Sequence, residues 1–174
     1  MKQDMPQPTS VERTFREDEI IVSKTDLKGI ITYANRTFLE VALYTEDEIL
    51  GQPHNLIRHP DMPRCVFKLL WDTILAGEEI FAYVKNMAKN GDYYWVFAHV
   101  TPTFNNAGEI TGFHSSRRKP DRRQIQIAEG LYRQLKNEED RHADWKTGMA
   151  AATEMLLQTL AAKHMQYDEF VFSI

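Results

Sequence analysis

The sequence predicts an α+β fold: a five-stranded antiparallel sheet with flanking helices, followed by a C-terminal helical extension. Two runs of β-branched residues come first, segments with helical spacing follow, and three further strand-like runs complete the group. After Pro120 the pattern changes to long amphipathic helices. We therefore divide the chain into an N-terminal lead-in (1–18), a central domain (19–119) and a helical extension (120–174).

The strands are predicted from β-branched and aromatic runs that end at turn sequences. They cover residues 19–24, 29–33, 80–87, 93–104 and 109–117. The turns between neighbouring strands are Asp26-Leu-Lys-Gly29, Lys89-Asn-Gly-Asp92 and Asn105-Asn-Ala-Gly108. Because Asn-Gly is the strongest short hairpin signal, the last three strands are expected to form a meander.

Helices are predicted where apolar residues recur three and four positions apart. In the lead-in and central domain they cover residues 11–16, 38–42, 47–51 and 63–77. Thr45 is a suitable cap for the third of these, which has acidic residues in its first turn. Pro63 suits the first turn of the fourth, and Asp61 lies where its N-cap is expected.

The extension contains two apolar stripes at helical spacing. The first comprises Ile125, Ala128, Leu131 and Leu135, and the second comprises Trp145, Met149, Ala152, Leu156 and Leu160. We expect the second stripe to join two protomers or to bind a partner helix, since water would otherwise cover it. The alternative is that this helix folds back on its own sheet. Residues 167–174 are again apolar and aromatic.

Composition favours a globular protein of a reducing compartment. Apolar residues make up 43% of the chain, and the net charge of −4 argues against a nucleic-acid binder. A single cysteine, Cys65, excludes an internal disulfide framework. No apolar run approaches the ~18 residues of a membrane span, and the first ten residues lack the apolar core of a secretory signal. We therefore expect a cytoplasmic location.

The segment between the short helices and the long helix carries the most specific pattern. It reads Gly51-Gln-Pro-His-Asn-Leu-Ile-Arg-His-Pro-Asp-Met-Pro63, with Trp71 eight residues on. Together with the strand order, this pattern resembles a PAS domain, and in particular the sensory domain of bacterial aerotaxis receptors. Further matching segments are Thr25-Asp-Leu27, Ala34-Asn-Arg-Thr-Phe38, Val84-Lys-Asn86 and Gly130-Leu-Tyr-Arg-Gln-Leu135. The resemblance covers about residues 20–135.

The resemblance implies a PAS fold that binds FAD non-covalently and signals its redox state or the presence of oxygen. By resemblance, the flavin-binding residues are Arg58, His59, Asp61 and Trp71, and the polar residues lining the pocket are Asn35 and Asn86. Their chemistry agrees with this reading. A pyrophosphate favours a bidentate cation such as Arg58, a flat ring favours an aromatic plane such as Trp71, and the flavin edge favours amides that both donate and accept.

Each of these residues also has an ordinary structural explanation. Trp71 lies on an apolar helical stripe and suits a core position. Asp61 and Asn35 suit N-caps, and His59 suits an exposed loop. His99 and His114 lie on predicted strands, and neither the pattern nor the resemblance gives them a role.

Alternative site chemistries remain open to different degrees. No His-x-x-x-His or Cys-x-x-Cys spacing supports a structural metal site. The main alternative to flavin is a haem or another small ligand on the same fold. Light-sensing flavin modules carry a cysteine three residues after the glycine that corresponds to Gly51, and His54 holds that position here. No catalytic or dinucleotide-binding motif is present, so we expect a sensor and not an enzyme, a flavoenzyme being the weakest hypothesis.

The resemblance also implies partners. Relatives continue into a membrane segment or linker and then a chemoreceptor-type helix bundle, whereas this sequence shows two helices instead. We therefore expect a homodimer that signals to a downstream protein, either as a stand-alone sensor or as part of a longer protein.

Overall fold

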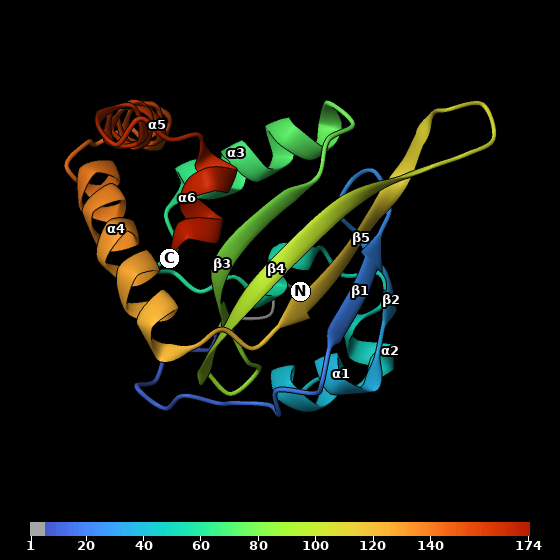
Figure 1. The fold of residues 1–174 in the computed structure, drawn as a ribbon. Helices are drawn as coiled ribbons and strands as arrows, with labels where there is room; N and C mark the ends of the chain where they lie inside the picture. The colour runs from blue at the N-terminus through green and yellow to red at the C-terminus, as the bar shows by residue number, and fades with distance from the viewer. Residues whose placement is uncertain (1–5) are drawn as a thin grey trace.

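The computed structural model describes residues 6–174 and contains one five-stranded sheet (Figure 1). The strands are β1 (Ile21–Thr25), β2 (Ile31–Ala34), β3 (Ile80–Met87), β4 (Tyr93–Phe104) and β5 (Ile110–Arg118). Their order across the sheet is β2-β1-β5-β4-β3, and every neighbouring pair is antiparallel. The α+β prediction is confirmed, with strand ends that agree to within two residues.

Two groups of helices surround this sheet. Between β2 and β3 lie α1 (Arg36–Ala42), α2 (Glu46–Ile49), the 3-10 helix η1 (His54–Ile57) and α3 (Arg64–Leu75). After β5 come α4 (Arg122–Asp140), α5 (Trp145–Ala162) and α6 (Tyr167–Ser173). Figure 1 shows the second group beside β3, with α6 near the middle of that strand. α6 was not predicted, because its seven residues are too few to show a period.

The segment between α2 and α3 touches both edges of the sheet. At one edge, the amide of Ile31 in β2 donates to Gln52, and the amide of Gly51 donates back to Ile31. At the other edge, Arg58 forms an antiparallel bridge with Asn86 of β3. Residues 51–58 therefore run from one edge strand to the other across the face that α1 and α3 cover.

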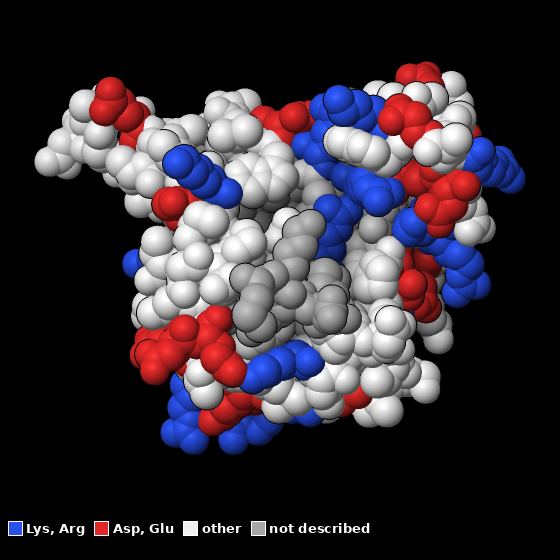
Figure 2. All heavy atoms as spheres, turned by 180° about the vertical axis from the view of Figure 1, so that it is seen from behind, with Lys and Arg blue, Asp and Glu red and all other residues white. Residues whose placement is uncertain are grey.

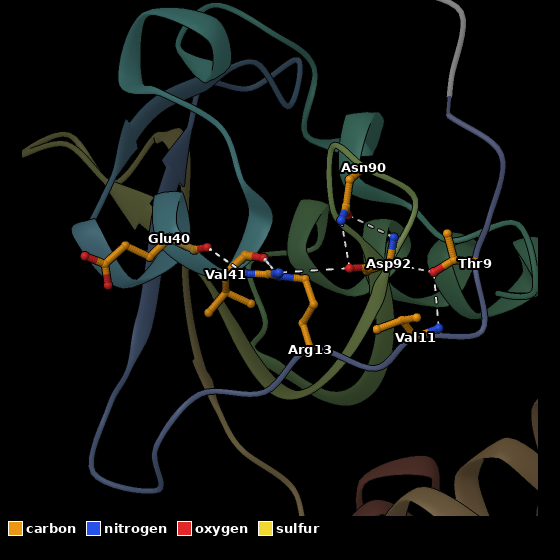
Figure 3. A network of polar contacts seen from close by, with 7 residues as sticks. All are labelled: Thr9, Val11, Arg13, Glu40, Val41, Asn90 and Asp92. Atoms are coloured by element: carbon orange, nitrogen blue, oxygen red, sulfur yellow. Dashed lines mark hydrogen bonds and ion pairs between the residues drawn. The ribbon is translucent and has the colours of Figure 1, made fainter.

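The lead-in is extended, so the predicted helix at 11–16 is wrong. Glu12 forms a parallel bridge with Tyr93, and the amide of Arg13 donates to the Tyr93 carbonyl at 2.7 Å. Next to these contacts, Thr9 donates to Asp92 at 2.6 Å, as Figure 3 shows. Backbone pairing with the start of β4 thus replaces the local hydrogen bonds that a helix would have used.

The caps of α1 and α3 differ from each other. Asn35 is the N-cap of α1: its Oδ1 accepts from the amides of Phe38 (3.1 Å) and Val22 (2.9 Å). The predicted cap at Asp61 is wrong, because Pro63 occupies the N-cap position of α3 and offers no side-chain hydrogen bond. Proline therefore precedes the first helical turn instead of lying within it.

Three residues of the apolar stripe of α5 are buried within the chain, whereas Trp145 at its start is 53% exposed. Ala152, Leu156 and Leu160 are at most 5% exposed and belong to the same core as the sheet. α5 packs mainly against α4 and α3 of its own chain, so helices and not chiefly the sheet cover these residues, and the intermolecular seam stays a prediction. α4 provides part of this cover: it packs along α5, and its Tyr132 stacks on Trp95 of β4 with ring centroids 6.4 Å apart. None of the helices in residues 6–174 combines the length and apolar character needed to cross a membrane.

Candidate functional site: a basic cavity on the inner face of the sheet

A cavity of about 570 Å³ lies between the sheet and the helices that connect β2 to β3. This volume is within the range of small-molecule sites. Two groups of buried apolar side chains meet at its wall: the main core contributes Val84, Val96 and Ala98, and a smaller cluster contributes Ile74, Val100 and Phe113. The sheet here keeps short side chains toward the helices, which leaves space that the core does not fill.

Aromatic side chains form one side of the cavity. Trp71 of α3 packs edge-to-face against Phe113 of β5, with ring centroids 5.5 Å apart and an interplanar angle of 90°. A Cβ at Gly29 would lie 3.0 Å from the Trp71 ring, so the turn after β1 must approach this ring without a side chain. The indole is thus held between a turn, a helix and a strand while one part of it faces the cavity.

Three polar side chains form the enclosed end of the cavity: Ser23 of β1, His54 of η1 and Arg117 of β5. The Arg117 Nη2 donates to Ser23 Oγ at 2.5 Å, and Ser23 Oγ lies 3.0 Å from His54 Nε2. Because Ser23 accepts from Arg117, its own hydrogen is available to His54 Nε2, which then acts as acceptor. Burial, followed by the charge of Arg117, lowers the pKa of His54 to about 3, so this imidazole is neutral.

Arg117 is the most unusual residue of the site. It is 2% exposed, and within residues 6–174 its Nε and Nη1 have no hydrogen-bond partner. Its guanidinium lies 4.5 Å from the centroid of the Phe38 ring, which covers one face of the group. Burial lowers the pKa of Arg117 to about 10, a value at which it still carries its charge at neutral pH. A buried cation with two unsatisfied donors is the kind of group that a ligand completes.

Further cations lie toward the solvent. Lys28, Arg58, Arg64 and Lys68 also line the cavity. Arg58 stacks on the ring of Phe67 at 4.0 Å, and burial, then the charge of Arg64, lowers its pKa. Figure 2 shows lysine and arginine side chains gathered side by side on the face seen from behind the sheet. Within residues 6–174 no aspartate or glutamate lines the cavity, so its charged groups all favour an electron-rich or anionic ligand.

The structure brings three of the six predicted site residues to the cavity. Arg58, Trp71 and Asn86 line it. Asn86 is 4% exposed and lines the cavity from β3, an edge strand of the sheet. Asn35 does not line the cavity, because both ends of its amide are engaged: Nδ2 donates to the Ile20 carbonyl at 2.7 Å while Oδ1 caps α1.

His59 and Asp61 lie behind the cavity wall. His59 is 3% exposed, and its Nδ1 accepts from the amide of Asp61 at 3.1 Å. Burial, then the charge of Lys85, lowers the pKa of His59 to about 4. The Asp61 carboxylate accepts from Lys85 Nζ at 2.7 Å; burial opposes its ionisation, but this lysine holds its pKa below the usual range. These two residues fasten the loop before α3 to β3, so they shape the cavity wall from outside.

The remaining histidines and the cysteine do not line the cavity. His99 stacks on Phe81 with centroids 4.1 Å apart and contacts Glu79 at 2.6 Å on the opposite face of the sheet. His114 pairs with Lys24 in the sheet register. Cys65 is buried in the first turn of α3, where burial and then Glu139 raise the pKa of its thiol to about 12.

The residues at the polar end of the cavity were not predicted from the sequence. One signal was available for Arg117: Phe113, Ser115 and Arg117 alternate along β5 and share one face, and Phe113 identifies that face as the buried one. A charged residue in an inward register position is unusual enough to mark a site. His54 carried a signal as well, because it holds the position at which light-sensing flavin modules carry their cysteine, whereas Ser23 carried none.

The C-terminal helices also reach the cavity. Trp145 and Met149 of α5 line it, although Trp145 is 53% exposed. Glu139 of α4 accepts from the amide of Cys65 at 2.8 Å and lies 3.8 Å from the rim residue Arg64. α4 and α5 therefore contact both the rim of the cavity and the start of α3.

Comparisons with known proteins agree with this geometry. The family model described as the PAS fold matches residues 31–117. The aerotaxis receptor of Escherichia coli (strain K12) is 42% identical over 130 residues, which cover 75% of this chain and 26% of the receptor. The nitrogen fixation regulatory protein of Klebsiella pneumoniae is 28% identical over 118 residues, which cover 68% of this chain and 23% of that protein. The chain thus spans about a quarter of the length of these curated relatives.

Solved structures share the fold. The light-state structure of the blue-light photoreceptor Aureochrome1 LOV superimposes with a TM-score of 0.56 at 24% identity, covering 62% of this chain and 87% of that one. A light-oxygen-voltage domain studied with a flavin analogue gives the same TM-score at 19% identity, covering 71% of this chain and 87% of that one. At these identities the likeness concerns the path of the backbone.

Proposed function

Because this chain belongs to the PAS-fold family, we propose that it is a sensory module that binds a flavin, specifically FAD, and relays the redox state of that flavin through its C-terminal helices. The observation that carries the proposal is the cavity with a buried, incompletely paired Arg117 at one end and a cluster of cations at the other. The proposal includes a cytoplasmic location and a role in signalling without catalysis.

The residues present fit a flavin nucleotide. Trp71 and Phe113 offer aromatic surface to a planar ring, and the Asn86 amide and the Arg117 fork offer hydrogen bonds to its polar edges. Arg58 and its basic neighbours suit a pyrophosphate, which FAD has and FMN lacks. When bound, the flavin supplies a centre that is reduced and reoxidised. A change in its protonation would turn an acceptor into a donor, to which the Asn86 amide can respond by exchanging its two ends.

A haem is less well supported by this geometry. Within the described residues His54 is the histidine that lines the cavity, and its Nε2 already lies 3.0 Å from Ser23 Oγ. An axial ligand would need this nitrogen free.

The proposed relay runs through the rim. Arg64 lines the cavity and also lies 3.8 Å from Glu139 of α4. A phosphate at the rim would compete with Glu139 for the Arg64 guanidinium. Trp145 and Met149 of α5 line the cavity and would contact the ligand directly. Changes at the ligand would then reach α4 and α5, from which a downstream signalling protein or a second copy of the chain would receive them.

The purified protein should be yellow, and heat release followed by chromatography should yield FAD. A colourless protein that takes up no added flavin would contradict the proposal, a Soret band would favour haem, and FMN alone would remove the role given to the rim cations. Trp71→Ala should lose most of the flavin while Trp71→Phe retains it, with circular dichroism to verify that both fold. Aromatic stacking alone contributes about 0.5–1.5 kcal/mol beyond area burial.

The relay has a separate test. Amide hydrogen exchange of α4 and α5 should differ between the oxidised and the dithionite-reduced protein, and Glu139→Gln should diminish that difference without removing flavin. Identical exchange in the two states would show that the signal does not pass through these helices.

A further inference from the structure

The charges around the cavity divide into two groups with different surroundings. The rim cations are partly solvated: the side chains of Arg64 and Lys68 are 45% and 43% exposed. Arg117 is almost fully excluded from solvent. Water can satisfy the rim cations in the free protein, but it reaches Arg117 only through the cavity.

The unsatisfied donors of Arg117 have a defined geometry. One arm of the guanidinium is fixed by Ser23 and one face is covered by Phe38, which leaves Nε and Nη1 without a partner among residues 6–174. The Nε–H and the Nη1 hydrogens lie on different edges of the guanidinium plane, so each favours an acceptor of its own, and no carboxylate of the described residues lines the cavity to provide one.

We infer that Arg117 donates to an electron-rich group of the ligand's ring, and, resting on the proposed function, that this ring is the isoalloxazine, which Arg117 binds more tightly in its reduced, anionic form. Two-electron reduction of the oxidised ring with uptake of one proton at N5 leaves a negative charge delocalised over N1 and the C2 carbonyl oxygen. A buried guanidinium in the wall of the ring's site stabilises the anion more than the neutral oxidised ring. Arg117 is therefore a specificity-determining residue for the reduced state, and it sets the midpoint potential of the bound flavin.

The neighbours of Arg117 support this role. His54 is kept neutral by burial and by Arg117 itself, so it does not compete for the anion with a second charge. Ser23 holds the guanidinium by a hydrogen bond that does not neutralise it. The positive charge of Arg117 thus remains available to the ligand.

Spectroelectrochemistry of the flavin-loaded full chain tests the inference, with dithionite as electron donor and the wild type compared with Arg117→Lys and Arg117→Gln. The measured quantity is the ratio of flavin dissociation constants for the oxidised and reduced states. Arg117→Gln should weaken binding of the reduced state at least tenfold more than binding of the oxidised state, which lowers the midpoint potential by about 30 mV for a two-electron couple. The effect of Arg117→Lys should lie between those of the wild type and Arg117→Gln, since lysine keeps the charge and loses the separate Nε and Nη1 donors.

The outcomes are distinct from one another. Equal weakening in both redox states with an unchanged potential would show that Arg117 only supports the cavity wall, and it would overturn the inference while leaving the proposed function intact. A potential that changes with Arg58→Gln but not with Arg117→Gln would move the anion-binding role to the rim and also overturn it. Absence of flavin from wild type and variants alike would overturn the proposed function and this inference together.

Discussion

Two polar regions of this molecule differ in how completely their hydrogen bonds are made. In the N-terminal network, Asp92 accepts from Thr9 at 2.6 Å and from Asn90 at 2.7 Å, and Arg13 donates to the last carbonyls of α1 at 2.8 and 3.3 Å (Figure 3). At the polar end of the cavity, Arg117 makes one hydrogen bond and leaves two nitrogens without a partner in the described part of the chain.

This difference in hydrogen bonding separates a region that supports the fold from a region that is available to bind a ligand. The N-terminal network fastens the lead-in and α1 to the turn before β4. Both of its charged side chains, Arg13 and Asp92, have hydrogen-bond partners. The cavity keeps a buried cation that costs stability unless something binds to it. Sites prepared for a ligand commonly lower the stability of the free protein. In the absence of a ligand, the polar end of the cavity should therefore destabilise this protein, whereas the N-terminal network should stabilise it.

The largest effect is expected for Arg117→Met in the protein from which flavin has been removed. Replacing an incompletely paired buried charge by an apolar side chain should raise the free energy of unfolding by about 1–4 kcal/mol. Urea unfolding measures it, and Arg118→Met is the control because Arg118 is exposed on the neighbouring position. A lower stability of Arg117→Met would mean that the residue is a structural member of the wall like those of the N-terminal network.

The next effect concerns pH. The pKa values of His54 and His59 are lowered to about 3 and about 4 from 6.5, chiefly by burial. The unfolded chain therefore binds more protons below about pH 6.5, and the free energy of unfolding should fall as the pH drops toward about 5. Each histidine contributes up to about 1.4 kcal/mol per pH unit in that window.

Urea unfolding at a series of pH values checks this expectation. The double variant His54→Gln/His59→Gln should show a flatter profile above about pH 5, where few carboxylates titrate. A slope that persists unchanged in the double variant would assign the pH dependence to other groups.

A smaller effect is expected in the N-terminal network. Thr9→Val removes the hydroxyl that donates to Asp92 and accepts from the amide of Val11, and it should destabilise the protein by about 1 kcal/mol. The loss should be the same with and without flavin, because this network lies outside the cavity. Thr103→Val is the matched control on an exposed strand position. A loss that depends on flavin would link the two regions.

No effect is expected from blue light. Cys65 does not line the cavity and its thiol stays protonated, so illumination should give no long-lived bleaching of the flavin bands, with Cys65→Ser identical to wild type. His54→Cys places a thiol on the cavity wall and is the positive control. Bleaching of the wild type that Cys65→Ser abolishes would contradict this prediction.

Much of the fold was predictable because turns and strands are encoded locally. The runs at 80–87 and 93–104 match β3 and β4 to the residue, since Asn90-Gly91 marks the hairpin between them. The lead-in was mispredicted because its partner, Tyr93, is 81 positions from Glu12 and leaves no trace in local spacing. The burial of the α5 stripe was likewise not visible in local spacing, because it depends on how α4 packs against α5.

The site was predictable in part. Arg58, Trp71 and Asn86 were placed by resemblance and do line the cavity. Asn35 and Asp61 belong to types that also cap or pair, and the structure shows the cap for Asn35 and the Lys85 ion pair for Asp61. The importance of Arg117 comes from the absence of a partner, and a missing contact is visible only once the neighbouring strands are placed.

The segment 51–58 has a consequence for solubility. Exposed edge strands are templates on which other chains can add, and aggregation commonly starts there. By pairing with Ile31 at one edge and with Asn86 at the other, this segment occupies backbone groups of both edge strands. The loop that carries Arg58 to the cavity therefore also shields the sheet, and substitutions that loosen it should appear first as turbidity on storage.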